Sequence, residues 1–243
     1  MSPVRRASLV VAVVLVAAAA IGLGRWQLRR LRDRRASNAA LAAAGELPAL
    51  ALPADLTAAR TIDSGRRIVA TGHFQTGDQV LLRGHVQDDA PGIQIVTPFV
   101  FDTGNTVLWV LRGFVRSPDA VTPPDTIPAP TTGTVTISGL ASAIPVTKDS
   151  GAALLHNGVT TWKRLDRAML AARRPGTLPV YLILAGDSSG AGRLAVVAPP
   201  TLSDGPHLSY ALQWFGIALA VITFGALVLW RDGRESLPRR EAP

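Results

Sequence analysis

The sequence predicts an α+β membrane protein in which two transmembrane helices flank one mostly antiparallel β domain outside the membrane. Three observations predict this fold class. Hydrophobic runs near both ends of the 243-residue chain are long enough to cross a bilayer. The region between them carries short β-branched runs separated by turn residues. The formal net charge of +8 comes from the arginines beside the two hydrophobic runs, because residues 36–230 hold equal numbers of acids and bases.

The first hydrophobic run is ASLVVAVVLVAAAAIGLG, residues 7–24. It is just long enough to span if the flanking arginines extend toward the headgroups. A cleaved signal peptide is the alternative, because Arg5 and Arg6 precede the run and its alanines offer a cleavage site. We expect a helix that is retained, since helix-forming residues continue without a breaker as far as Gly45.

The central region has the pattern of an antiparallel sheet. Residues 67–74 and 79–86 are predicted to form a hairpin across QTGD, and residues 92–101 and 106–115 a second hairpin across DTGN. Further strands are expected at 133–140, 160–163, 178–185 and 193–198. Asp166 is a suitable N-cap for a short helix over 167–173.

The second hydrophobic run, HLSYALQWFGIALAVITFGALVLW, occupies residues 207–230 and has no charge after its histidine. On a helix, His207, Tyr210 and Trp214 lie within about 60° of one another in the first two turns. One membrane boundary therefore carries a polar and aromatic stripe. The predicted parts of the chain are a transmembrane helix with a basic extension (1–35), the helix end and a linker (36–66), the β domain (67–200), the second transmembrane helix (207–230) and a tail (231–243).

The arginines give conflicting predictions of topology. Four arginines follow the second run, which favours a cytoplasmic C-terminus and, with two spans, a cytoplasmic N-terminus. The arginines from Arg25 to Arg35 outnumber Arg5 and Arg6, which taken alone would place the N-terminus outside. We give the second span more weight, so we expect both termini in the cytoplasm and an extracytoplasmic β domain.

Several classes of function are disfavoured. The basic residues flank hydrophobic runs and the body is neutral, which argues against nucleic-acid binding. The chain has no cysteine, so disulfides and thiolate metal sites are excluded. No catalytic or phosphate-binding motif is present, and the four histidines have no partner at metal-site spacing. We therefore do not expect an enzyme.

An ordered set of motifs resembles the surfeit-locus protein one family, also called Shy-type proteins, which are cytochrome c oxidase assembly factors. The motifs are LGRWQLRRLRDR (23–34), VATGHF (69–74), GIQIVTPF (92–99), VLRGFV (110–115) and HLSYALQWF (207–215). They cover nearly the whole chain in order. Phe114 stands where the family usually has tryptophan, Arg34 where it usually has lysine, and Gly205–Pro206 where polar residues commonly precede the histidine.

The resemblance implies a protein of the bacterial cell membrane, or of the mitochondrial inner membrane in a eukaryote, that handles haem a transiently or supports maturation of oxidase subunit I. It implies as partners subunit I, other respiratory-complex subunits, haem a biosynthesis proteins and membrane lipid. With both termini inside, the exit of the first helix and the start of the second lie at one depth. The expected cofactor-binding residues are His207 as haem iron ligand, Tyr210, Trp214, Trp26, Gln27 and Arg30.

Each of these residues also has a simpler interpretation. The aromatic residues could anchor the helices at the membrane surface, and the arginines could contact lipid headgroups. Arg112 and Gly113 could be a strand-end charge and a bulge glycine, with contact to a partner protein as the other interpretation. Two other classes of function stay open: a structural accessory subunit that remains bound to the respiratory oxidase or supercomplex, and an enzyme of the outer membrane face. Small residues at Ala211, Ala218 and Gly225 would let the second helix pack closely against a neighbour.

Overall fold

The protein forms two compact units, residues 1–39 with 202–243 and residues 40–201. The computed structural model describes the chain except residues 63, 103–104, 148–150, 157–158, 187–193 and 236–243. The elements in chain order are α1 (Pro3–Glu46), β1 (Leu50–Leu52), α2 (Leu56–Ala59), β2 (Arg67–Phe74), the 3-10 turn η1 (Thr76–Asp78), β3 (Val80–Gln87), β4 (Ala90–Val100), β5 (Val107–Arg116), β6 (Val135–Ala143), β7 (Leu154–His156), β8 (Val159–Trp162), α3 (Arg167–Arg173), β9 (Thr177–Leu184) and α4 (His207–Glu235).

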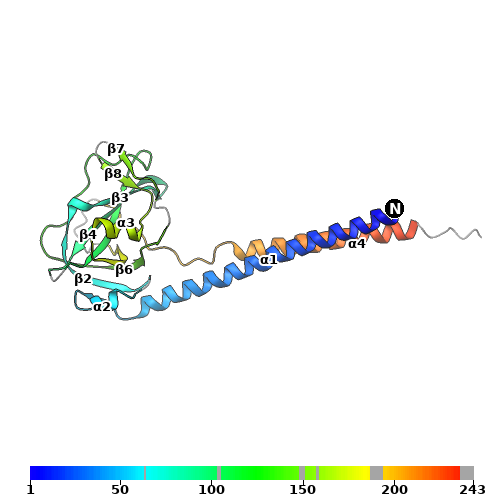
Figure 1. The fold of residues 1–243 in the computed structure, drawn as a ribbon, viewed down its shortest axis with the longest axis horizontal. Coiled ribbons are helices and arrows are strands. Elements are labelled where there is room, and N and C mark those ends of the chain that lie inside the picture. The colour runs from blue at the N-terminus through cyan, green and yellow to red at the C-terminus, as the bar shows by residue number, and fades with distance from the viewer. Residues whose placement is uncertain (63, 103–104, 148–150, 157–158, 187–193, 236–243) are drawn as a thin grey trace, which may run out of the picture. The chain divides into compact units, whose positions relative to one another are not determined.

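The first unit is an antiparallel pair of long helices, α1 and α4 (Figure 1). Both helices are long and apolar enough to cross a membrane. At one end of the pair the amino group of Met1 lies 2.5 Å from Oδ1 of Asp232, and Arg6 Nε lies 3.6 Å from Oδ2 of the same carboxylate. The start of α1 and the last described turns of α4 therefore lie together, as the expected topology requires. The side of the membrane on which they lie remains a prediction.

Small residues bring the two helices into close contact. A Cβ atom at Gly24 would lie 2.6 Å from the ring of Phe215, and one at Gly225 would lie 2.6 Å from Val13. Together with these glycines, the buried residues of this contact are three, four or seven positions apart: Ala17, Ala20 and Leu31 on α1, and Ala211 and Ala218 on α4. This spacing is that of two helices that pack with a seven-residue repeat. Glycine and alanine suit it because they let helix backbones approach.

Five strands of the second unit close into a ring. They are neighbours in the order β2, β6, β9, β5 and β4, and β4 returns to β2 where His73 pairs with Val100 and Phe74 with Phe99. Alternate residues of these strands, including Ile68, Phe99 and Val110, pack together in one buried cluster, which fills the interior of the ring. Side chains on the other face of β5 and β9, including Trp109 and Ile183, form a second buried cluster with Leu170 of α3.

The sheet is mixed, which corrects the prediction of a mostly antiparallel domain. β1 pairs with β2, β3 with β8 and β5 with β9 in parallel. β9 follows α3 in the chain and enters the sheet between β5 and β6, far from its sequence neighbours. A period-2 pattern predicts that a segment is a strand, but it carries no information about which distant strand becomes its partner.

The two predicted hairpins had different outcomes. The hairpin of β4 and β5 is confirmed, because Val100 pairs with Val107. The hairpin of β2 and β3 is wrong: the connection contains η1, and β3 pairs with β4 instead. The turn between β3 and β4 places Asp88 and Asp89 at φ values of 50° and 57°, as a two-residue type I′ turn requires. The hairpin of β3 and β4 was not predicted from the sequence.

The remaining predicted elements were mostly confirmed. The short helix α3 spans Arg167–Arg173, and Asp166 caps it by accepting a hydrogen bond from the backbone N–H of Met169 at 3.0 Å. Strands β8 and β9 lie within one residue of their predicted ranges, and β6 begins two residues and ends three residues later than predicted. The strand expected at 193–198 begins outside the described residues, and its described part forms only one bridge, between Ala195 and Phe114. β1, α2 and β7 were not predicted, since each is only three or four residues long.

Candidate functional site

The first turn of α4 is fixed by the residues just before it. Gly205 adopts a φ of +68°, which few residues other than glycine adopt readily. The carbonyl of Pro206 accepts hydrogen bonds from the backbone N–H of Tyr210 at 3.1 Å and from the hydroxyl of Ser209 at 2.8 Å. This turn makes His207 the first residue of α4, with its half-buried side chain directed toward α1.

The imidazole of His207 is bound to Gln27 of α1. Its Nδ1 lies 2.8 Å from the amide oxygen Oε1 of Gln27. In the tautomer that carries its proton on Nδ1, the imidazole donates to this oxygen and keeps a lone pair on Nε2. A neutral imidazole with one nitrogen held and the other free is the state in which histidine ligates a metal.

A second set of contacts lies about two to three turns further along α1. Nε of Arg34 and the side-chain amide of Asn38 both donate to the carbonyl of Ser203, at 3.0 and 3.1 Å. Nε of Arg35 lies 2.8 Å from Oδ2 of Asp204. These contacts anchor the segment before α4 to α1. These contacts were not predicted, although the acidic Asp204, three residues before His207, complements the arginine run of α1 in charge.

The structure brings some of the predicted cofactor-binding residues together and leaves others apart. Gln27 and His207 are in contact, and Arg30 lies about one turn beyond Gln27 on the same helix. Trp26 and Tyr210 are 46% and 47% exposed, and Trp214 is partly buried. Among the described residues, no hydrogen bond or ring contact joins these aromatic side chains to the imidazole. Trp26 and Tyr210 therefore lie on the surface of the helix pair.

The chemistry of this group suits a flat, anionic, iron-containing cofactor. Nε2 of His207 supplies a nitrogen ligand, the exposed aromatic side chains supply apolar surface, and the guanidinium of Arg30 supplies a cation for a carboxylate. Within the described ranges, no group of three or more His, Cys, Asp or Glu side chains converges as a metal site would require. A single histidine nitrogen can serve as one axial ligand of a cofactor.

Arg112 and Gly113 lie within β5 and not at its end. Arg112 is the extra residue of a bulge in β5, because Leu111 pairs with Val96 and Gly113 pairs with Ile95. Arg112 is 2% exposed, and its guanidinium donates to the carbonyl of Pro128 and, at 3.3 Å, to Oε1 of Gln79. Burial lowers the pKa of Arg112 to about 10. The interpretation as a strand-end charge is therefore wrong, and contact with a partner remains a prediction.

Position 113 needs a glycine because the segment that contains Leu194 and Ala195 packs directly against it. A Cβ atom there would lie 2.7 Å from Cβ of Leu194 and 2.8 Å from the carbonyl oxygen of Ala195. The next residue, Phe114, exchanges two backbone hydrogen bonds with Ala195, at 2.8 and 2.9 Å. The RGF motif therefore fixes the described segment after residue 193 against β5.

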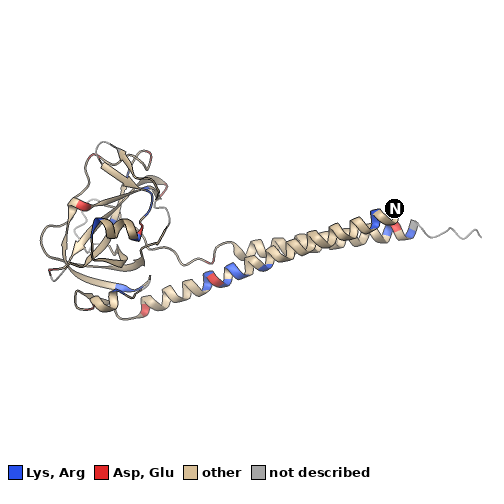
Figure 2. Cartoon of the chain, in the orientation of Figure 1, with Lys and Arg blue, Asp and Glu red and all other residues tan. Residues whose placement is uncertain are grey.

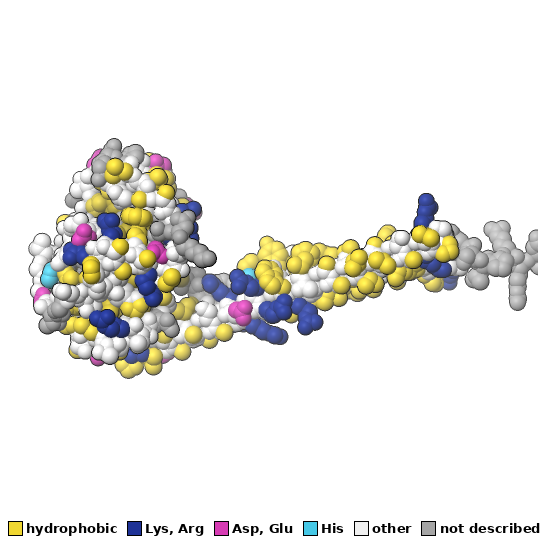
Figure 3. Space-filling view, viewed as in Figure 1, with side chains coloured by type: hydrophobic (Ala, Val, Ile, Leu, Met, Phe, Trp, Pro, Cys, Tyr) yellow, Lys and Arg dark blue, Asp and Glu magenta, His cyan; other side chains and the backbone are white. Residues whose placement is uncertain are grey.

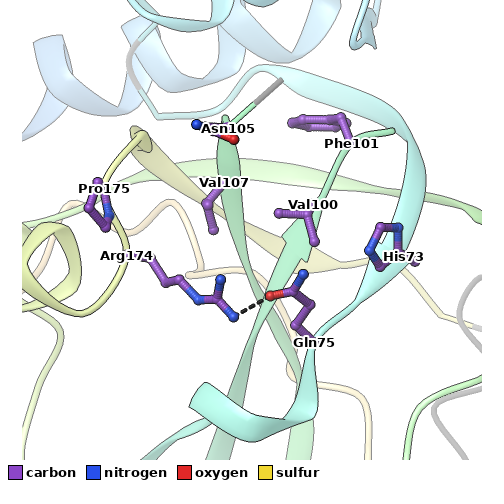
Figure 4. A pocket seen from close by; sticks show the side chains of 8 residues that line it. All are labelled: His73, Gln75, Val100, Phe101, Asn105, Val107, Arg174 and Pro175. Carbon is purple, nitrogen blue, oxygen red and sulfur yellow. Dashed lines mark hydrogen bonds between the residues drawn. The ribbon is translucent and has the colours of Figure 1, made fainter. Parts of the chain in front are cut away.

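A cavity of about 360 Å³ opens at the seam of the strand ring (Figure 4). Its walls include Val100, Phe101 and Val107, and its polar side chains include His73 and Arg174. Arg174 is already neutralised by Asp78, whose Oδ2 lies 2.6 Å from its Nη2, and it also donates to Gln75. His73 lies 3.3 Å from the carboxylate of Asp102. Asp78 therefore offsets the positive charge of Arg174 at this cavity.

Comparison with known proteins adds the identity of relatives. Residues 14–219 match the SURF1 family. The chain is 35% identical over 163 residues to uncharacterized SURF1-like proteins of Mycobacterium tuberculosis and Mycobacterium bovis, a match that covers 66% of this chain and 58% of theirs. It is 26% identical over 249 residues to a SURF1-like protein of Monosiga brevicollis, which covers 96% of this chain and 92% of that protein. The chain thus spans less than three fifths of the mycobacterial relatives.

Proposed function

Because the chain belongs to the SURF1 family, known in general as cytochrome oxidase assembly factors, we propose that it supports the maturation of cytochrome c oxidase by handling haem a. In this proposal the two long helices span the membrane, both termini are cytoplasmic and the β domain is extracytoplasmic. The partners are subunit I of the oxidase and the proteins that make haem a. The protein carries out no covalent chemistry of its own.

The hydrogen bond between Gln27 and His207 supports this proposal more than any other single observation. It joins the two family motifs that lie furthest apart in the sequence, and it does so at one end of the helix pair. A haem carrier needs an imidazole whose orientation and proton are fixed before the cofactor arrives. Gln27 gives His207 both properties without adding a charge.

Haem a, when bound, would supply the iron porphyrin that the oxidase later uses for electron transfer. The protein's residues would bind and orient it. Nε2 of His207 would face the iron, Arg30 would pair with a propionate, and Trp26, Tyr210 and Trp214 would offer apolar surface to the macrocycle. The location beside an apolar helix pair also suits the long hydrocarbon tail of haem a, which would remain in lipid.

The alternative of a permanent accessory subunit has less support. It depended on Ala211, Ala218 and Gly225 as a surface for a helix of another protein. All three are buried, and Gly225 packs directly on Val13 of α1. These small residues therefore pair the protein's own helices.

The test is the haem a content of the oxidase in cells that carry His207→Ala. We expect that content to fall while the amount of this protein in the membrane stays unchanged, because the first turn of α4 is held by Pro206 and Arg35 as well. His73→Ala is the matched control, since His73 lies in the β domain. Equal haem a content in His207→Ala and parent cells would refute the proposal.

A further inference from the structure

The arginines that follow the apolar part of α1 divide into groups with different surroundings. Arg34 and Arg35 are held by Ser203 and Asp204. The structure records no hydrogen bond or ion pair from Arg25, Arg29 or Arg32 to any residue that it describes, and all three are exposed. Figure 2 shows this concentration of basic residues on α1 close to the start of α4.

The three arginines without such a partner share one face of the helix. At about 100° per residue, positions 25, 29 and 32 fall within about 60° of one another. The same geometry places Gln27 about 140° to 160° away from each of them. Arg30 lies about 100° to 160° from the three, on the side of Gln27. The three arginines therefore form a cationic face on the side of α1 opposite the candidate haem site.

This cationic face lies at a defined distance from the apolar part of α1. Arg25 directly follows the apolar run that ends at Gly24, and Arg32 lies about 10 Å further along the helix axis. The headgroup region of one leaflet is about 5 to 8 Å thick, and an arginine side chain can extend several ångströms toward it. In a membrane-spanning α1 the three guanidiniums thus reach lipid phosphates. Figure 3 shows basic side chains gathered beside the apolar surface of the helix pair.

We propose that Arg25, Arg29 and Arg32 form a binding site for an anionic phospholipid. Charge complementarity favours this occupant, because three guanidiniums with one nearby acid, Asp33, face a layer of phosphates. The opposite ends of the two helices differ: there Arg6 is paired with Asp232, and Arg234 stacks on the ring of Trp230 at 3.9 Å. Lipid binding would also give these three arginines a role on the extracytoplasmic side, where the rule that positive residues favour the cytoplasmic side disfavours them.

The site is tested with the full-length protein, purified in detergent and mixed with equal amounts of phosphatidylglycerol and phosphatidylcholine that have the same acyl chains. Native mass spectrometry then gives the ratio of the two lipid adducts. We expect several phosphatidylglycerol adducts for each phosphatidylcholine adduct. Each arginine replaced by glutamine should lower the ratio, by up to about fivefold, until R25Q/R29Q/R32Q shows no preference.

Two further variants make the test specific. R25K/R29K/R32K should keep the preference, because a lysine also binds a phosphate as a point charge. R5Q/R231Q/R234Q removes the same number of charges at the opposite end of the helix pair and should also keep it. A parent ratio near one, an unchanged ratio in R25Q/R29Q/R32Q, loss of the preference in the lysine variant, or an equal loss in R5Q/R231Q/R234Q would each overturn the proposal.

Discussion

The imidazole of His207 lies 2.8 Å from the amide oxygen of Gln27, although 180 residues separate them in the sequence. Each residue lies at the boundary between an apolar and a more polar part of the sequence: Gln27 follows the apolar run of α1, and His207 is the first residue of α4. The contact places the first turn of α4 beside the middle of α1, and the ion pair of Met1 with Asp232 at the other end makes the two helices antiparallel. The geometry of one hydrogen bond thus depends on packing along the whole helix pair.

Gln27 should act on the cofactor through the histidine. Gln27→Leu removes the acceptor from Nδ1, and we expect haem a to bind purified protein at least about tenfold more weakly, as is typical when the partner of a metal-ligating histidine is lost. Gln27→Glu should restore binding because a carboxylate accepts the same proton. Gln213→Leu, at an exposed position of α4, serves as the control. Unchanged affinity in Gln27→Leu would show that the hydrogen bond does not position the imidazole.

The contact between Val13 and Gly225 can be tested by a disulfide. A Cβ atom at Gly225 would lie 3.4 Å from Cβ of Val13, close to the separation of about 3.8 Å in disulfides. Since the chain has no cysteine, V13C/G225C should form one crosslink on oxidation, seen as a mobility shift that reductant reverses. V13C/G216C should not, because a Cβ at Gly216 has no neighbour within 4 Å. Absence of the first crosslink would contradict the antiparallel packing.

Gly113→Ala should destabilise the β domain by about 1 to 3 kcal/mol, because the added methyl group would overlap Leu194 and the carbonyl of Ala195. The measurement is the unfolding midpoint of the purified protein in denaturant. Gly77→Ala is the control, since a Cβ at Gly77 meets no atom within 4 Å. If both variants unfolded at the parent's midpoint, the segment at Leu194 would not be packed on β5 as described.

Asp166 should make the β domain sensitive to acid. Hydrogen bonds from the backbone N–H groups of Thr147 and Met169 lower the pKa of this carboxyl below its ordinary value of 3.8. A carboxyl with a lowered folded-state pKa stabilises the fold above the unfolded value and loses that contribution as the pH falls through the folded value. Thermal unfolding of the parent should therefore occur at lower temperature below about pH 4.

Asp166→Asn tests this dependence because asparagine also caps a helix but does not titrate. We expect the variant to lose less thermal stability than the parent between about pH 5 and pH 3. Asp125→Asn, at an exposed position, should follow the parent. A parallel decline in parent and Asp166→Asn would show that other carboxyls cause the acid sensitivity.

Local features were predictable from sequence. The length and apolarity of α1 and α4, the cap at Asp166 and the hairpin of β4 and β5 each depend on neighbouring residues only. The prediction that the 26–30 segment faces the start of α4 required only two antiparallel hydrophobic runs that cross the same membrane. The contact between Gln27 and His207 fits that prediction, while the binding of haem remains untested.

Long-range features were not predictable in this way. The position of β9 between β5 and β6 depends on where the chain returns after α3, and no local pattern encodes this. The burial of Arg112 was missed because a charged residue in a strand normally points to water. Here a bulge turns it inward, and Gln79 and Pro128 supply acceptors from elsewhere in the chain.

The most direct test of the central claim is the absorbance spectrum of the full-length protein purified from cells that synthesise haem a. If His207 holds the cofactor with the help of Gln27, the parent should carry a haem a spectrum, Gln27→Leu should carry less of it, and His207→Ala should carry none. A parent protein without pigment, or a His207→Ala protein with as much haem a as the parent, would contradict the account.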